Sequence, residues 1–492
     1  MRLILTGLLL ISIVISSFSQ NKRGLAYGYH SPQDLQVLTP SVSWWYNWSE
    51  APEASVANVF TNYNMEFVPM TWNGNFDTNK LTTFLTNNPQ TKYLLAFNEP
   101  NFTDQANMTP SQVAALWPTL EAIADSFNLE IVGPAVNYCG NCVSENGTTY
   151  NSPFDYLDDF FAACQGCRVD YISFHSYMNN IGALSWYLNQ YKSYGKPIWV
   201  TEFAGWEQNG TINNLSDQIN FMIGAVDLFE SDTSVYKYSW FIGRGAGINT
   251  YPHIDILGNN GELTALGEIY TQMPVHDVNN IVDIPARIEA ENYNSMDGIL
   301  LEQTQDVSGF ANVGYIEGGD WLEYKINVPA SNSYPLYFRV ASTATSSLKV
   351  IVDGNDVLTQ NFTNTNGWQN WQTFNTNIAL GQGIHTIRLE AITNGFNINW
   401  FQIGDNITDV TDLESEENSI KIFPNPVKDQ LYVELSEDFE GFYAIYDVLG
   451  RLRIQDKKMD IESIDVSTLE KGVYSICFYN SKVIKSIKFI KN

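Results

Sequence analysis

The stretch Tyr93-Leu94-Leu95-Ala96-Phe97-Asn98-Glu99 decides how the first half of the chain folds. An uninterrupted apolar run that ends in an amide and a carboxylate is typical of a strand buried on both faces, the kind found in parallel sheets. The stretch Ile198-Trp199-Val200-Thr201-Glu202-Phe203 has the same design. Both stretches therefore predict parallel strands that carry a glutamate near the carboxyl end.

Eight runs of this kind occur in the first half of the chain. Helix-like segments such as Ser111–Phe127, with Ser111 as the N-cap, and Ser216–Phe229 separate most of them. Eight strands that alternate with helices over about 250 residues predict a (β/α)8 TIM barrel at 22–274. A doubly wound parallel sheet is the alternative. The runs are Leu25–Tyr29, Ser41–Asn47, Glu66–Trp72, Lys92–Asn98, Glu130–Val136, Asp170–Tyr177, Pro197–Phe203 and Lys237–Gly243.

The composition limits what the protein binds. The chain has 492 residues, 44% of them apolar, which is enough for about two to four domains. Its 54 acidic and 26 basic residues give a formal net charge of −28, which repels phosphate backbones and anionic membranes. We therefore expect no nucleic-acid partner. Only 16% of residues are charged while 14% are aromatic, a balance that suits a neutral, ring-shaped ligand such as a sugar.

The second half of the chain has a different pattern. Residues 286–404 alternate between apolar and polar positions, as in Trp321-Leu322-Glu323-Tyr324, which predicts a β-sandwich (jelly roll). Residues 420–492 predict a smaller β-sandwich of the same style. We expect a linker at 275–285 and an acidic linker at 405–419 between these three domains.

The chain begins with the pattern of a signal peptide at 1–19. Arg2 precedes the apolar run Leu3–Ile15, and Ser17 and Ser19 give small residues at the spacing of a cleavage site. The run is shorter than the ~20 residues of a membrane span. We expect an exported, soluble monomer with no transmembrane segment.

Export affects the interpretation of two C-x-x-C pairs, Cys139 with Cys142 and Cys164 with Cys167. Their separation is slightly longer than that of a zinc ribbon, and an oxidising compartment favours disulfides. We expect two disulfides rather than a zinc site, with the connectivity left open.

Polar and aromatic residues gather at the expected strand ends, where barrels of this kind have their active sites. Glu99 and Glu202 follow the fourth and seventh runs. Two carboxyl groups about 5–5.5 Å apart hydrolyse glycosides with retention of configuration. A single glutamate in such a place is more often an exposed loop residue, and it is the pair that favours catalysis. The candidates for substrate binding are Asn98, Trp45, Asn47, Trp48, Trp72, His175, Tyr177 and Trp240; packing in the barrel is the alternative for half of the tryptophans, and a hydrogen-bonded core position is the alternative for His175.

The segments Asn98-Glu99-Pro100 and Thr201-Glu202-Phe203 resemble the catalytic strand ends of clan A glycoside hydrolases. More specifically, Arg23–Ala26, Ser43–Trp48, Glu66–Met70 and Ser173–Tyr177 resemble glycoside hydrolase family 128, the endo-β-1,3-glucanases. The resemblance implies Glu99 as acid/base, Glu202 as nucleophile and Asn98 as the amide that holds the sugar 2-hydroxyl. It implies β-1,3-glucan as substrate and no cofactor for catalysis.

The middle domain has two carboxylates on one strand face, Glu289 and Glu291. Such a pair suits Ca²⁺, and an exposed strand edge is the alternative. The stretches Gly319–Tyr324, Gly367–Trp371 and Phe396–Trp400 resemble family 6 carbohydrate-binding modules. The resemblance implies a sugar site at Tyr315, Trp368 and Asn397, and a structural Ca²⁺ at Glu289, Glu291 and Asn399. Asn399 replaces the aspartate usual in that family, which lowers the expected affinity for calcium.

The end of the chain resembles the C-terminal sorting domain of the type IX secretion system, through Phe423–Pro426, Ile445–Arg451 and Lys471–Tyr474. The resemblance implies contact with that secretion machinery and a location outside the cell or on the outer-membrane surface. The sequence therefore predicts a secreted retaining β-1,3-glucan hydrolase with a polysaccharide-binding module. A hydrolase of another β-linked glucan and a non-catalytic, glycan-binding surface adhesin are the alternatives.

Overall fold

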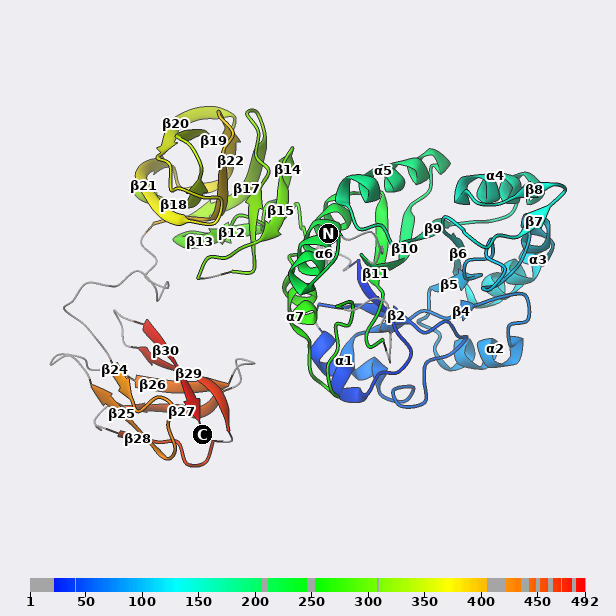
Figure 1. Ribbon diagram of the computed structural model, residues 1–492, viewed down its shortest axis with the longest axis horizontal. Helices are drawn as coiled ribbons and strands as arrows, with labels where there is room; N and C mark the ends of the chain where they lie inside the picture. The colour runs from blue at the N-terminus through cyan, green and yellow to red at the C-terminus, as the bar shows by residue number, and fades with distance from the viewer. Residues whose placement is uncertain are drawn as a thin grey trace, which may run out of the picture.

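The computed structural model describes residues 22–39, 41–205, 211–245, 253–307, 309–404, 421–434, 442–447, 452–458, 463–469, 471–479 and 484–491. These residues form three regions, which follow one another along the chain (Figure 1). The expected signal peptide at 1–19 and the expected acidic linker at 405–419 lie outside the described residues. Among the described residues, no helix is both long and apolar enough to span a bilayer.

The first region contains one curled parallel sheet in the order β3-β2-β1-β11-β10-β9-β6-β5-β4. Its two edge strands are separated in the chain by only Val68 and Pro69. The amide of Val68 donates to the carbonyl of Trp45, and the amide of Leu95 donates to the carbonyl of Pro69. One extended stretch thus bonds to both ends of the sheet. The strands are β1 (Arg23–Ala26), β2 (Trp44–Tyr46), β3 (Glu66–Phe67), β4 (Met70–Thr71), β5 (Tyr93–Ala96), β6 (Glu130–Val136), β9 (Tyr171–Ser176), β10 (Ile198–Phe203) and β11 (Val235–Trp240).

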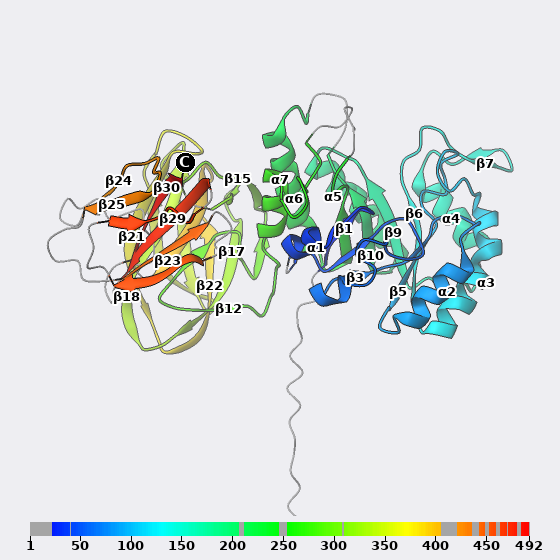
Figure 2. The ribbon, with the colours of Figure 1, turned by 90° about the horizontal axis from the view of Figure 1, so that it is seen from below.

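Helices lie between most of these strands and cover the outside of the sheet (Figure 2). They are α1 (Pro32–Leu38), α2 (Thr78–Asn87), α3 (Pro110–Phe127), α4 (Pro153–Ala163), α5 (Ile181–Tyr191), α6 (Leu215–Ser231) and α7 (Ala265–Gln272), with 3₁₀ turns η1 (Phe60–Tyr63) and η2 (Lys192–Tyr194) and the short ribbon β7 (Ser144–Glu145) and β8 (Thr148–Thr149).

The expected start of helix α3 was wrong by two residues. Its N-cap is Thr109, and Pro110 occupies the first turn, where a missing N–H costs nothing. Gln112 reaches back to accept from the backbone amide of Thr109. Ser111 instead donates its hydroxyl to Glu145.

Alternate residues of one strand contribute to two separate core clusters. Trp44 and Tyr46 of β2 pack inside the curled sheet with Tyr93 and Trp199. Trp45 belongs to the other cluster, between the sheet and the helices. The inner cluster is aromatic and supports the side chains at the carboxyl end of the sheet.

The two C-x-x-C pairs each close on themselves, as the disulfides Cys139–Cys142 and Cys164–Cys167. The expectation of disulfides is confirmed, and the zinc alternative is wrong because all four thiols are consumed. The loop after β6, which contains Cys139, is tied to two other segments. The backbone amide of Cys139 donates to the carbonyl of Asn151, and the side chain of Asn101 donates to the carbonyl of Asn137.

The second region is made of two six-stranded sheets. Strand β17 alternates buried and half-buried residues throughout, as its sequence predicts. The rings of Tyr324 and Phe401, one from each sheet, lie 4.7 Å apart, so the sheets share a core. Strand β12 lies in the expected linker and pairs with β17. The strands are β12 (Ile281–Asp283), β13 (Ala286–Glu289), β14 (Ser295–Asp297), β15 (Leu300–Gln303), β16 (Ala311–Gly314), β17 (Trp321–Val328), β18 (Asn332–Ser342), β19 (Ser346–Val352), β20 (Asn355–Phe362), β21 (Trp371–Leu380), β22 (Gly383–Ala391) and β23 (Phe396–Ile403).

The third region has a core of its own, which includes Leu431, Ile445 and Phe489. Its described strands form a three-stranded sheet, β24-β25-β28, and a four-stranded sheet, β27-β26-β29-β30. They are β24 (Lys421–Phe423), β25 (Gln430–Glu434), β26 (Phe442–Asp447), β27 (Leu452–Lys458), β28 (Ser463–Asp465), β29 (Gly472–Tyr479) and β30 (Ile484–Lys491).

Candidate active site

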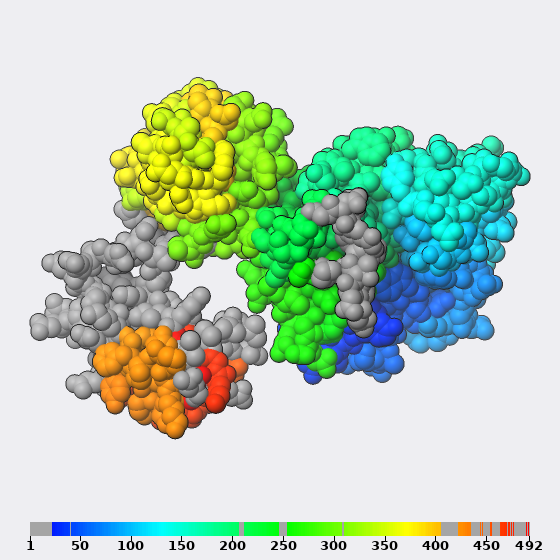
Figure 3. Space-filling view, in the orientation of Figure 1, coloured from blue at the N-terminus to red at the C-terminus, as the bar shows by residue number. Residues whose placement is uncertain are grey.

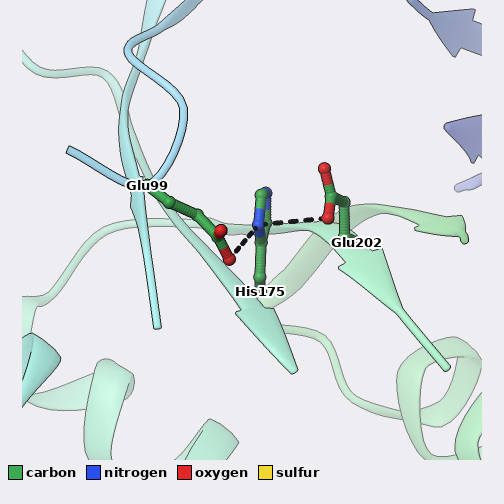
Figure 4. A group of neighbouring side chains, drawn as sticks. All are labelled: Glu99, His175 and Glu202. Carbon is green, nitrogen blue, oxygen red and sulfur yellow. Dashed lines mark hydrogen bonds and ion pairs between the residues drawn. The ribbon is translucent and has the colours of Figure 1, made fainter. Parts of the chain in front are cut away.

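Two buried glutamates face each other at the carboxyl end of the parallel sheet. Glu99 follows β5 and Glu202 lies in β10, and they are 8% and 4% exposed. One oxygen of each carboxylate lies within 4.8 Å of the other (Figure 4). The backbone of Glu99 has a φ of 41°, which is uncommon for a residue with a side chain and marks a site held in place by its surroundings.

His175, from β9, lies between the two carboxylates (Figure 4). Its Nδ1 is 3.0 Å from Oε1 of Glu99 and 3.3 Å from Oε2 of Glu202. Burial lowers the pKa of His175, but the charge of Glu202 and the hydrogen bond to Glu99 outweigh it, and the pKa rises above its usual value. The Nδ1 of His175 thus lies within reach of both carboxylates, whose charge favours the protonated imidazole.

Three donors hold the carboxylate of Glu202. Tyr46 donates to Oε1 over 2.9 Å, the indole of Trp48 donates to the same oxygen over 2.8 Å, and Tyr177 donates to Oε2. Burial raises the pKa of Glu202, and nearby Glu99 adds to the rise, while His175 and the bonds from Tyr177 and Trp48 oppose it. The donors therefore stabilise the ionised form that a nucleophile needs.

Tyr46 was not among the candidates drawn from the sequence. The signal was present, because Tyr46 ends the strand Trp44–Tyr46, and its ring must face the same side of the sheet as Trp44. The pKa of the Tyr46 hydroxyl is raised well above its usual value, chiefly by burial and then by the charge of Glu202, so it remains a donor.

A cleft of about 740 Å³ opens above the two carboxylates. Of the candidate residues for substrate binding, Asn98, Trp48, Trp72 and Tyr177 line it. The amide oxygen of Asn98 is buried and has no hydrogen-bond partner among the described residues, so it is free for a ligand. The sequence did not single out the other lining residues for substrate binding, which are Phe102, Asp104, Gln105, Asn137, Tyr138, Met178 and Phe241.

Four of the candidate residues do not line the cleft. His175 is fully buried between the two glutamates. The expectations for the other three need correction. Trp45 is fully buried between the sheet and the helices, against Phe60 and Phe67. Trp240 is also fully buried and donates to the carbonyl of Ile254. Asn47 donates its amide to Ala51 and Glu53, and so shapes its own loop. In a strand buried on both faces, apolarity does not reveal which face each ring takes.

The three residues expected to bind sugar in the second region, Tyr315, Trp368 and Asn397, lie near Glu302 and one another. Tyr315 and Trp368 are 63% and 51% exposed. The amide of Asn397 lies buried, where it donates to the carbonyl of Trp368 and to Glu302. Glu302 also accepts from Asn312 and Gln369, and it was not among the residues predicted from the sequence. Its role depends on pairing between distant strands, which no local pattern reveals.

Oxygen atoms converge around Gly309 in the same region. A Cβ at Gly309 would lie 3.4 Å from Oδ1 of Asn399, 3.8 Å from the carbonyl of Ala311 and 3.9 Å from Oε2 of Glu289. Glu291 is 2% exposed, and its Oε2 has no partner among the described residues. Burial raises the pKa of Glu291 to about 8. The carboxylate of Glu289, the side-chain amide oxygen of Asn399 and the carbonyl of Ala311 are the kinds of ligand that fit a hard cation such as Ca²⁺.

Residues 24–270 match the family model of the glycosyl hydrolase catalytic core. A family 128 (subgroup II) endo-β-1,3-glucanase from Sorangium cellulosum is 42% identical, over 52% of this chain and 100% of that one, with a TM-score of 0.47. It is this sequence identity, over the whole length of the relative, that assigns the family. The chain belongs to glycoside hydrolase family 128.

This family 128 hydrolase also matches two further family models. Residues 289–405 match the carbohydrate-binding module of family 6, and residues 421–492 match the secretion system C-terminal sorting domain. The module of lichenase 5A from Cellvibrio mixtus, solved with cellotriose, is 37% identical over 25% of this chain and 98% of that one, with a TM-score of 0.24.

A curated relative of the hydrolase is the alkali-sensitive linkage protein 1 of Schizosaccharomyces pombe. It is 28% identical over 264 residues, which are 51% of this chain and 44% of that protein. The chain thus spans less than half the length of that relative.

Proposed function

We propose that the hydrolase is a secreted endo-β-1,3-glucanase that acts with retention of anomeric configuration and binds its polysaccharide through an attached module. The spacing of Glu99 and Glu202, whose nearest oxygens lie within 4.8 Å, carries this proposal. Retaining glycosidases hold their carboxyl groups about 5–5.5 Å apart, whereas inverting enzymes need about 6.5–9.5 Å to admit a water molecule. The spacing supports a double displacement.

In the first step Glu99 gives its proton to the glycosidic oxygen as the bond from that oxygen to the anomeric carbon breaks. An oxygen of Glu202 forms a bond to the carbon, which leaves a glycosyl-enzyme. Glu99 then takes a proton from the water that attacks the same carbon, and Glu202 is released. The three donors on Glu202 support its role as nucleophile. Asn98, with its buried amide oxygen in the cleft, holds the sugar 2-hydroxyl in this proposal.

The choice of β-1,3-glucan rests on the Sorangium cellulosum relative. Another β-linked glucan is the second candidate, because the Cellvibrio mixtus module was solved with cellotriose. A non-catalytic adhesin is disfavoured, since binding alone gives no reason to bury two neighbouring carboxylates, which is costly.

The finer features of fold and location belong to the same proposal. The stretch that joins β3 to β4 supports eight strands closed into a (β/α)8 barrel. The two sheets of the binding module are taken as a jelly roll. Export through the type IX system, with a signal peptide and a final place outside the cell or on the outer-membrane surface, is proposed from the match of the sorting domain. A monomeric state stays a prediction.

We also propose a structural Ca²⁺ in the module, held by Glu289, Glu291 and Asn399. The oxygen atoms that surround Gly309 support this site. The cation would neutralise the buried charge of Glu291 and join strand β13 to strand β23.

The proposal is tested by incubating the full chain with laminarin, lichenan, cellulose and xylan, and sizing the products. Short oligosaccharides from laminarin are expected. Proton NMR of the first product should show the β anomer before mutarotation. Release of products from another glucan with none from laminarin would contradict the substrate, and an initial α anomer would contradict retention.

A further inference from the structure

The binding module is fixed against helix α6 of the catalytic region. The backbone amide of Gln303 donates to Oδ1 of Asn220 over 2.9 Å, and the hydroxyl of Ser216 donates to Oε1 of Gln303 over 3.0 Å. Tyr293 and His276 both bond to the buried carboxylate of Asp227. In the space-filling view the module lies directly against the catalytic region (Figure 3). The two regions therefore hold a defined orientation.

A cavity of about 370 Å³ lies at this junction, within the ~300–1,000 Å³ of small-molecule sites. Its module side includes Glu302 and Tyr315, two residues of the sugar site described above. Its catalytic side is supplied by the loop after β9 and by α6, and includes Asn179, Asn220 and Phe221. The sugar site of the module is thus one wall of a cavity whose other wall belongs to the catalytic region.

Three features suit this cavity to an uncharged polyhydroxylated ligand. The Nδ2 of Asn179 is buried and has no hydrogen-bond partner among the described residues. The carboxylate of Glu302 is held by amides from Asn312 and Asn397, so it is fixed as an acceptor for hydroxyl groups. Tyr315 has a φ of 56°, a strained value for an aromatic residue, and this backbone turn presents its ring at 63% exposure.

The cavity also adjoins the active site along the chain. Met178 lines the catalytic cleft, and the next residue, Asn179, lines the junction cavity. One loop after β9 therefore contributes to both. A ligand in the cavity would lie at the same end of the sheet as Glu99 and Glu202.

We propose that the module and the catalytic region together form a composite glucan site, in which Asn179 completes the sugar site of Glu302 and Tyr315. The site takes part of a β-glucan chain, and the inference rests on the proposed function for the identity of that glucan. The module would then bind sugar more tightly in the full chain than its own residues allow.

The test is a calorimetric titration of the full chain carrying Glu202→Gln, which blocks turnover, with laminarihexaose. Tyr315→Ala in this background defines the module site as the binding event that it removes. Asn179→Ala is expected to weaken that same event roughly threefold to tenfold, the cost of one hydrogen bond in a binding site. Asn179→Gln, which keeps the amide, should restore part of the affinity.

Asn62→Ala, an exposed asparagine of the catalytic region away from the cavity, is the matched control and should bind as the parent does. Melting curves of each variant separate lost contacts from lost folding. An unchanged module-site affinity in Asn179→Ala, or an effect confined to the active-site event, would overturn the composite site.

The same titrations with cellohexaose separate this inference from the substrate proposal. If laminarihexaose does not bind and cellohexaose does, the Asn179 effect on cellohexaose still supports the composite site, while the β-1,3 assignment fails. Absence of binding to either glucan would overturn the composite site as well.

Discussion

The hydroxyl of Tyr46 donates to Oε1 of Glu202 over 2.9 Å, across the inside of the curled sheet. Tyr46 is fully buried and does not line the catalytic cleft, so it acts through Glu202. We predict that Tyr46→Phe lowers kcat on laminarin roughly tenfold to a hundredfold, because a hydrogen bond to a charged group contributes about 1.5–3 kcal/mol. KM should change little, which steady-state kinetics will show. Tyr93→Phe removes another hydroxyl near the same inner core cluster, where it bonds Tyr236, and controls for the loss of a buried bond.

Replacement of Glu99 should separate the two chemical steps. We predict that Glu99→Ala lowers the rate on laminarin by about 10²–10⁴-fold, the usual contribution of a general acid or base. Aryl glycosides with good leaving groups should still react in the first step, because they need no proton. Azide should then restore turnover and yield a β-glycosyl azide, identified by mass spectrometry and NMR.

Glu202→Gln is the counterpart of that experiment. It keeps the shape of the side chain and removes the nucleophile, so no substrate should react and azide should restore nothing. A Glu202→Gln enzyme with the parent rate would show that another group attacks the sugar.

The position of the two glutamates could be predicted from the sequence, because each follows an apolar run and so lies near the carboxyl end of a strand. The face of the sheet on which each strand residue lies could not be predicted. Trp44, Trp45 and Tyr46 are all apolar or aromatic, yet Trp45 packs outside the sheet while Tyr46 reaches Glu202. Only the pairing with neighbouring strands decides which side each ring takes.

Contacts between segments that lie far apart in the chain could not be predicted from the sequence either. Glu302 reaches Asn312 and Asn397 only because β15 pairs with β16 and β16 pairs with β23. The last strand of the parallel sheet was expected at Lys237–Gly243 and spans Val235–Trp240. A charged lysine is not expected inside a buried strand, so the sequence predicts Lys237 as the first residue of this one. In the structure its ammonium lies buried over the rings of Trp44 and Trp199, within the strand.

The raised pKa of His175 predicts a pH-dependent contribution to stability. A histidine whose pKa is higher in the folded than in the unfolded protein stabilises the fold fully below about pH 6.5, its unfolded value. That stability is lost as the pH rises through the raised folded value. The parent should therefore melt at a higher temperature than His175→Gln, and the difference should be largest below pH 6.5. The gap should shrink on going to alkaline pH; a gap that is constant with pH would contradict a raised pKa of His175 in the folded protein.

Trp368 should carry much of the polysaccharide binding by the module. We predict that Trp368→Ala in the full chain weakens adsorption to insoluble β-1,3-glucan roughly tenfold, or about 1.4 kcal/mol. Trp186 offers a matched control, because it is also 51% exposed but lies on helix α5. Trp186→Ala should adsorb like the parent. Equal losses in the two variants would mean that exposed rings act non-specifically.

The ionisation of Glu291 provides a test of whether the module binds calcium. Without a cation, burial holds the pKa of Glu291 at about 8, well above the usual value of 4.5, so the folded state binds a proton that the unfolded state releases. Stability should then fall as the pH rises from about 4.5 to 8 in the presence of a chelator. Calcium binds the ionised form and should remove this loss, raising the melting temperature at pH 7.5.

Glu291→Gln separates the charge from the shape of this side chain. Because the parent is mostly protonated at pH 7 in chelator, the variant should melt close to the parent there. It should gain little from added calcium, while the parent gains several degrees. Calorimetric scans of both proteins with calcium and with chelator make the comparison, and a parent whose melting temperature ignores calcium would show that Glu289, Glu291 and Asn399 hold no cation.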